Sequence, residues 1–317
     1  MAQSLFMVLR QRFPEVQIDV LAPAWSRTLL ERMPEVRNAI NMPLGHGQLQ
    51  LGLRRRLGLE LRDQHYDQAI LLPNSLKSAL TPFFARIPRR TGFAGEMRYG
   101  LLNDIRPLDK QRLSMTVQRF VALGLEARDV LPDAIPQPRL ITPADGADTA
   151  IDELGLRTDD APILGLCPGA EYGPAKRWPH YAALAVDYLA RGWRVWLFGS
   201  DKDQAVTEAI SRAAPGCEDL AGRTRLAQAI DLLARCDAVV SNDSGLMHVA
   251  AALGRPLVAI YGSSDPGFTP PLTDRAEIVR RGLECSPCFE RVCPLGHTLC
   301  LNDITPADVD DAVTRLL

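Results

Sequence analysis

The motif SNDSGLMH at residues 241–248 is the strongest chemical signal in the sequence. It follows an apolar run that predicts a strand and opens an alanine-rich run that predicts a helix. The first N–H groups of a helix lack partners and lie at the positive end of its dipole, so this turn suits a phosphate. Gly245 lets a ligand approach the backbone, Ser244 adds a hydroxyl, and His248 follows about one turn later. The alternative is that Asp243 or Ser244 is only an N-cap and His248 only a packed helix residue.

A second loop, CPGAEYGPAKRWP at residues 167–179, also follows a predicted strand. Open parallel sheets bind ligands at the carboxyl ends of their strands. Lys176 and Arg177 place positive charge there, and a lysine can neutralise a diphosphate leaving group as its bond breaks. The alternative is a solvated loop in which Trp178 and Pro179 simply begin the next helix.

A third candidate loop, LPNSLKS at residues 72–78, ends a predicted strand in the first half of the chain. Four basic residues could extend it into a rim for an anionic acceptor, namely Arg89, Arg90, Arg98 and Lys110. Three carboxylates of the same region could act as bases, namely Glu96, Asp104 and Asp109. Exposed arginines are common, so the alternative for most of these positions is solvated surface.

Four of the seven cysteines gather in one segment, together with His297: Cys285, Cys288, Cys293 and Cys300. Such a set could hold a structural zinc ion, although its second spacing is irregular. The alternatives are reduced thiols in a loop and an adventitious disulfide. We expect the three scattered cysteines, Cys167, Cys217 and Cys236, to be reduced and buried.

The elements that must position these groups alternate between strands and helices, which predicts a parallel α/β architecture. Helices are expected over 3–12, 25–32, 180–191, 204–213, 226–235 and 245–253, and strands over 16–22, 68–73, 162–167, 194–199, 238–241 and 256–261. Residues 131–148 are rich in Pro and Asp and lack periodicity, so they indicate a connection between domains. We therefore expect two α/β domains around a cleft, over residues 1–150 and 151–317.

The bulk composition excludes few functions. Lys plus Arg number 36 and Asp plus Glu 38, so the net charge of −2 gives no general attraction to nucleic acid. No run approaches the roughly 20 apolar residues of a membrane helix. The first residues also lack the pattern of a signal peptide. We expect a cytoplasmic protein whose membrane contact is peripheral.

Two motifs, NDSGLMHVAAAL at 242–253 and the loop at 167–179, resemble the ADP-heptose:lipopolysaccharide heptosyltransferases. Similar stretches occur at 22–25, 41–47, 72–80 and 95–104, so the resemblance covers essentially the whole chain. It implies an inverting GT-B glycosyltransferase, with two Rossmann-like domains facing a cleft, that requires no metal or other cofactor. The implied reaction moves L-glycero-D-manno-heptose from ADP-heptose to the first heptose of the lipopolysaccharide inner core. The acceptor would be heptosylated Kdo-lipid A at the cytoplasmic face of the inner membrane.

The resemblance also implies roles for particular residues. Lys176 matches the lysine that contacts the donor phosphates, and it would stabilise the leaving group together with His248. The diphosphate-binding turn of the donor domain, residues 151–317, matches Asp243, Ser244, Gly245, Leu246 and His248. The acceptor candidates in residues 1–150 are Asn74, Ser75, Lys77 and Arg98.

The sequence departs from the family pattern at its start. Family members resemble one another in opening with a strand and a Gly- and Asp-containing loop, whose aspartate is the general base. This sequence opens on a helix, so we expect that strand and loop to be absent and name no base. Three alternatives stay open: a related heptosyltransferase with another acceptor, a nucleotide-sugar epimerase, and an inactive ADP-sugar-binding protein.

Overall fold

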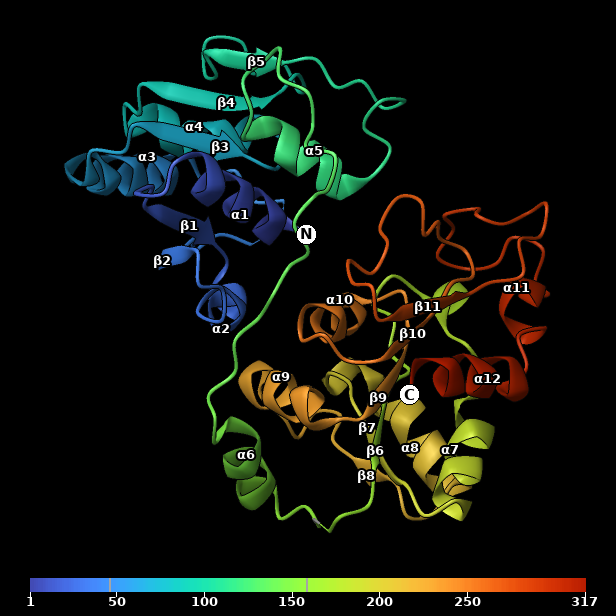
Figure 1. Cartoon of the computed structure of the whole chain (residues 1–317). Helices are drawn as coiled ribbons and strands as arrows, with labels where there is room; N and C mark the ends of the chain where they lie inside the picture. Colours follow the sequence, from blue (N-terminus) through green and yellow to red (C-terminus); the bar gives the residue numbers. More distant parts are fainter. Residues whose placement is uncertain (46, 158) are drawn as a thin grey trace. The chain divides into compact units, whose positions relative to one another are not determined.

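The computed structural model describes residues 1–45, 47–157 and 159–317, so His46 of the 41–47 motif lies outside the described residues. The chain divides into two compact units (Figure 1). One comprises residues 1–31 and 35–136, and the other comprises residues 32–34 and 137–317. The division at Pro136 falls within the Pro- and Asp-rich stretch of the sequence. Across the described part of the chain, no helix is long and apolar enough to cross a membrane.

The first unit begins with helix α1 and contains two groups of parallel strands. Its strands are β1 (Ile18–Ala22), β2 (Val36–Asn41), β3 (Gln68–Leu71), β4 (Arg89–Phe93) and β5 (Asp104–Arg106). One sheet has the order β1-β2 and the other β3-β4-β5, and in the described residues no ladder joins β1 to β3. Its helices are α1 (Ala2–Arg12), α2 (Arg27–Leu30), α3 (Leu51–Glu60), α4 (Leu76–Phe84) and α5 (Thr116–Leu123), with 3-10 turns at Ala24–Ser26 and Leu61–Gln64.

Packing in the first unit fixes the loop that follows β3. Leu71, at the end of β3, packs with Ala79 of α4 and with Leu102 in a buried cluster. Helix α3 packs so closely on α4 that a Cβ on Gly58 would lie 2.6 Å from the Cβ of Phe84.

The helix expected over 25–32 is shorter in the structure. A 3-10 turn precedes α2, and Pro34 disfavours helical backbone at the residue before it.

The second unit contains a six-stranded, fully parallel sheet with the order β11-β10-β9-β6-β7-β8. Its strands are β6 (Ile163–Cys167), β7 (Arg194–Leu197), β8 (Glu218–Asp219), β9 (Ala238–Asn242), β10 (Leu257–Ile260) and β11 (Ala276–Val279). Counted along the chain, this is the doubly wound order whose direction reverses between its first and fourth strands, here β6 and β9. The expected parallel α/β class is confirmed, and the reversal point marks where a ligand would bind.

Helices cover both faces of this sheet (Figure 1). They are α6 (Gly146–Leu154), α7 (Tyr181–Ala190), α8 (Gln204–Ala213), α9 (Leu226–Arg235), α10 (Gly245–Ala252), α11 (Leu299–Asn302) and α12 (Pro306–Leu316). Alternate residues of β6, Leu164 and Leu166, lie in one core with residues of α7 and α12 such as Leu184 and Val309. All five residues of β6 are buried, as expected for a central parallel strand.

Candidate functional site

Two of the three loops singled out from the sequence meet at the reversal point of the second sheet. Cys167 at the end of β6 lies opposite Ser241 of β9 in the parallel ladder. The 167–179 loop and the turn into α10 therefore leave neighbouring strands at the same edge of the sheet. This juxtaposition joins two segments that are more than 60 residues apart.

Asn242 holds the two loops together. Its side chain is fully buried, and its Oδ1 accepts hydrogen bonds from the Trp178 backbone N–H at 3.1 Å and the Tyr181 hydroxyl at 3.2 Å. Its Nδ2 donates to the Pro168 carbonyl at 2.7 Å. This residue lies in the 241–248 motif, but the sequence alone gave it no role. The available signal was a polar amide at the end of a strand that begins with three apolar residues, since a buried amide must find several partners.

Lys176 and Asp243 form an ion pair between the loops. Lys176 closes a short 3-10 turn, and its Nζ lies 2.5 Å from Asp243 Oδ2. The two side chains are only 15% and 7% exposed. The lysine is therefore held at the strand end, and its charge is balanced before any anionic ligand arrives.

The N-terminus of α10 lies beside this pair and is not capped by a side chain. Ser244 occupies the N-cap position, but its hydroxyl makes no capping bond and lies 3.3 Å from the Ser241 hydroxyl. Gly245 is exposed, and nothing described lies within 4 Å of the position of a Cβ on it. The first N–H groups of the helix thus have no side-chain acceptor and suit a phosphate oxygen.

His248 and Leu246 lie in the first turns of the same helix, and both are partly buried. Burial lowers the pKa of His248 well below its ordinary value, because the interior disfavours the imidazolium. At neutral pH the side chain is a neutral imidazole. It can donate a hydrogen bond to a ligand oxygen but adds no positive charge to the site.

The acceptor candidates of the first unit lie around the end of β3. Arg98 is only 2% exposed, and its guanidinium donates to the carbonyls of Pro73 and Phe93, to the Ser78 hydroxyl and to Asn74 Oδ1. It therefore holds the 73–78 loop from within and does not present its charge at the surface. Burial lowers the pKa of this arginine, an expected effect for a cation bonded only to neutral groups.

The other three acceptor candidates are more accessible. Asn74 is exposed, Ser75 is the N-cap residue of α4, and Lys77 is partly buried in its first turn. The Leu76 N–H donates to Glu96 Oε2 at 2.7 Å, so that carboxylate caps α4. Two arginines of the wider basic rim serve the fold instead: Arg89 pairs with Asp104 and Glu126, and Arg90 donates to the carbonyls of Ile87 and Leu101. Lys110, the remaining member of the rim, is exposed.

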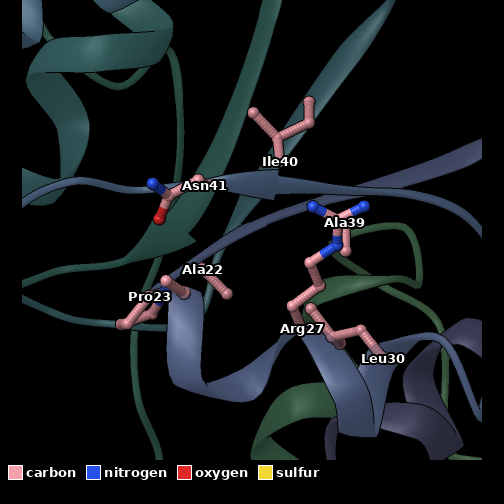
Figure 2. A pocket seen from close by; sticks show the side chains of 8 residues that line it. Ala22, Pro23, Arg27, Leu30, Ala39, Ile40 and Asn41 are labelled. Atoms are coloured by element: carbon pink, nitrogen blue, oxygen red, sulfur yellow. The ribbon is translucent and has the colours of Figure 1, made fainter.

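A separate concavity lies in the first unit at the carboxyl ends of β1 and β2 (Figure 2). Its walls are mainly apolar, and Arg27 and Asn41 supply the polar side chains. The Arg27 guanidinium donates to Glu31 at 2.7 Å. Ala22, Pro23 and Ala24 of the 22–25 motif line this concavity, although the sequence predicted no site residue there.

All seven cysteines are free thiols. Cys167 and Cys236 are buried, as expected, whereas Cys217 is only partly buried. In the segment 285–300, Cys285 is exposed and Cys288, Cys293 and Cys300 are partly buried. Among the residues that the structure describes, no three His, Cys, Asp or Glu side chains are arranged to hold a metal ion.

Comparisons with known proteins agree with this architecture. Residues 54–299 match the family model of glycosyltransferase family 9 (heptosyltransferase). The chain is 50% identical to lipopolysaccharide heptosyltransferase 2 of Salmonella typhimurium, covering 100% of this chain and 94% of that protein. It is 53% identical to lipooligosaccharide heptosyltransferase 2 of Haemophilus influenzae, covering 88% and 84%.

A solved structure supports the same assignment. The structure of ADP-heptose lipopolysaccharide heptosyltransferase II of E. coli superposes with a TM-score of 0.87 at 45% identity, covering 99% of this chain and 93% of that one. The expected GT-B class is thereby confirmed. Both the sequence match and the superposition extend across the two units, and the chain belongs to glycosyltransferase family 9, the heptosyltransferases.

Proposed function

We propose that the chain transfers L-glycero-D-manno-heptose from ADP-heptose to the first heptose of the lipopolysaccharide inner core. One observation carries the donor assignment: Lys176 lies beside the uncapped N-terminus of α10 at the reversal point of the sheet. A lysine and free helix N–H groups at that point suit a nucleotide diphosphate. The names of the relatives with about 50% identity indicate a heptose as the sugar and lipopolysaccharide as the product. The configuration of the heptose and its acceptor position follow from the family resemblance of the sequence.

In the proposed reaction, an acceptor hydroxyl oxygen attacks C1 of the heptose from the face opposite ADP. A new C1–O bond forms while the bond from C1 to the β-phosphate oxygen breaks, and ADP leaves with that electron pair. The hydroxyl proton passes to a base, and the configuration at C1 inverts. The chain must therefore stabilise negative charge that grows on the diphosphate.

The groups at the strand ends are suited to that task. Lys176 can bind a phosphate oxygen while remaining close to Asp243, so the carboxylate orients the ammonium group. The N–H groups that start at Gly245 and the neutral imidazole of His248 add hydrogen-bond donors. Together with Ser244 and Leu246, these residues form the proposed donor site.

We also propose that the transfer needs no metal or other cofactor. The support is that Lys176 and the helix N-terminus already provide positive electrostatic potential where charge develops. Transfer should therefore persist at an unchanged rate in excess EDTA. Loss of activity in EDTA that returns with a divalent cation would contradict this proposal.

The acceptor is proposed to bind at the end of β3, through Asn74, Ser75 and Lys77, with Arg98 holding the loop. Since Kdo-lipid A is anchored in a membrane, the enzyme would work at the cytoplasmic face of the inner membrane through peripheral contact. Co-sedimentation with vesicles that contain heptosylated Kdo-lipid A tests this. Equal binding to vesicles without the acceptor would assign the contact to the lipid surface instead.

Transfer from ADP-heptose to inner-core acceptors with one heptose or with none tests the proposed function. Product should form on the monoheptosylated acceptor, and Lys176→Met should reduce it strongly. Lys202→Met is a matched control, because Lys202 is 76% exposed and pairs with Glu171 of the 167–179 loop, here termed the donor loop. Preference for the acceptor without heptose would indicate the related heptosyltransferase. Conversion of the donor sugar without acceptor would indicate an epimerase, and ADP binding without turnover a binding protein.

A further inference from the structure

The ring of Tyr172 lies against the cation of the donor site. Lys176 Nζ is 5.0 Å from the centroid of this ring, within the range of a cation–π contact. The ammonium group therefore has two described partners, the Asp243 carboxylate at 2.5 Å and the aromatic ring. The carboxylate compensates the charge, and the ring limits the directions in which the lysine can point.

Tyr172 is itself held by the cysteine-rich segment, residues 285–300. Its hydroxyl donates to the Phe289 carbonyl at 2.5 Å, and the Arg291 guanidinium carbon lies 5.3 Å from its ring centroid. The side chain is on the surface, with 38% of the residue exposed. Its orientation therefore depends on these particular contacts and not on burial in a core.

The backbones of the donor loop and the segment also touch. The Ala175 N–H donates to the Arg291 carbonyl at 3.1 Å, directly before Lys176. Gly173 has φ +149°, and a Cβ there would lie 2.4 Å from the same carbonyl oxygen. Only glycine permits this approach at that backbone conformation.

The segment is in turn fixed to the sheet beyond β10. The Phe289 N–H donates to the Ser263 carbonyl at 2.7 Å, and the Ser286 hydroxyl donates to the Gly262 carbonyl at 2.6 Å. A continuous set of contacts thus runs from the end of β10 through Phe289 and Tyr172 to Lys176. Asp243, at the end of β9, completes it.

We propose that Tyr172 is a positioning residue that orients Lys176 toward the donor diphosphate, with the cysteine-rich segment serving as its fixed support. The inference rests on the proposed donor site and adds a residue and a segment to it. It gives segment 285–300 a role that needs no metal, because the segment supports the donor loop that carries Lys176. Tyr172 acts through the lysine and is not itself a catalytic residue.

ADP affinity measured by calorimetry, together with KM for ADP-heptose, tests the proposal. Tyr172→Leu removes the ring and should weaken ADP binding and raise the donor KM about tenfold, with the acceptor KM unchanged. Tyr172→Phe keeps the ring and its contact with Arg291 but loses the bond to Phe289, so its loss of affinity should be smaller than that of Tyr172→Leu. Gly173→Ala, which pushes the segment away from the loop, should impair donor binding in the same direction as Tyr172→Leu.

A double-mutant cycle separates positioning from general damage. If the ring acts through the lysine, Tyr172→Leu should cause no further loss of ADP affinity in a Lys176→Met background. Equal losses in both backgrounds, or wild-type affinity of Tyr172→Leu, would overturn the inference. Phe13→Leu, in the first unit, is a matched control. Phe13 is 53% exposed, and the Arg12 guanidinium carbon lies 5.8 Å from the centroid of its ring. A wild-type chain that neither binds ADP nor transfers heptose would instead refute the proposed function.

Discussion

Lys176 Nζ lies 2.5 Å from Asp243 Oδ2, and the pair joins the loops that follow two neighbouring strands of the second sheet. Both side chains are largely removed from water, so each depends on the other for compensation of its charge. A donor diphosphate would therefore meet a lysine that is already oriented. The same carboxylate would repel the diphosphate if the lysine were absent.

Lys176→Met should lower both ADP affinity and stability. Removing the cation leaves Asp243 as an unpaired buried carboxylate, which typically costs about 3–5 kcal/mol of unfolding free energy. The double variant Lys176→Met/Asp243→Asn should regain most of that stability but little ADP affinity. Urea unfolding and calorimetry with ADP measure the two quantities. Wild-type ADP affinity in the double variant would show that the lysine does not contact the donor.

His248 should make the stability of the chain depend on pH. Burial lowers its folded-state pKa to about 4 from an ordinary value of 6.5, so the unfolded state binds more protons between these values. Stability should therefore fall as the pH drops from 6.5 towards 4, by at most about 1.4 kcal/mol per pH unit from this group. The difference in unfolding free energy between wild type and His248→Gln, measured across that range, isolates the contribution. A difference that stays constant with pH would contradict the assignment.

Most of the architecture could be predicted from the sequence, because apolar strands alternate with amphipathic helices throughout the second unit. Because parallel sheets bind ligands at strand ends, the sequence also predicted ligand-binding loops after β6 and β9. Periodicity and composition could not reveal that these two strands are neighbours; only the family resemblance implied that both loops contact the same diphosphate. Strand order depends on tertiary packing, so the Lys176–Asp243 pair and the contacts of Asn242 became visible only in the structure.

Arg98 illustrates a second limit of the sequence. The sequence grouped it with the basic residues of a surface rim, and its neighbours Met97 and Tyr99 are 81% and 72% exposed. The structure instead buries its guanidinium between the carbonyl of Pro73, 25 residues earlier in the chain, and that of Phe93, five residues earlier. Local pattern does not record a partner as far along the chain as Pro73. The segment 285–300 shows the same limit, because its cysteine spacing suggested a metal site and no local pattern marked Phe289 and Arg291, which contact the donor loop.

Arg98→Met should impair acceptor binding more than donor binding. The substitution leaves the carbonyls of Pro73 and Phe93 without their donor, at about 1–3 kcal/mol for each unsatisfied buried group. The 73–78 loop should loosen, so we expect a higher KM for the acceptor and an unchanged KM for ADP-heptose. Arg62→Met is the matched control, because Arg62 donates to the Phe84 carbonyl at 2.9 Å within the same unit. Equal changes of both KM values would argue against a role confined to the acceptor loop.

The cysteines should differ widely in their reaction with iodoacetamide. Burial raises the pKa of Cys167 to about 12 and also raises that of Cys236, so both thiols should stay protonated and inaccessible. In contrast, the backbone N–H of Thr298, with smaller contributions from its neighbours, lowers the pKa of Cys293. A short pulse at neutral pH, read by peptide mass spectrometry, should therefore label Cys293 well before the two buried thiols.

The same labelling connects the thiols to the donor site. Cys293 is two residues from Arg291, whose carbonyl accepts from the donor loop, so a bulky adduct there should displace the support of Tyr172. ADP affinity should fall after labelling of the wild type and should remain unchanged in labelled Cys293→Ser. In urea all seven cysteines should react with iodoacetamide. That result would show that the folded structure causes the difference in labelling rate. Fast labelling of Cys293 with undiminished ADP affinity would show that this end of the segment can move without disturbing Lys176.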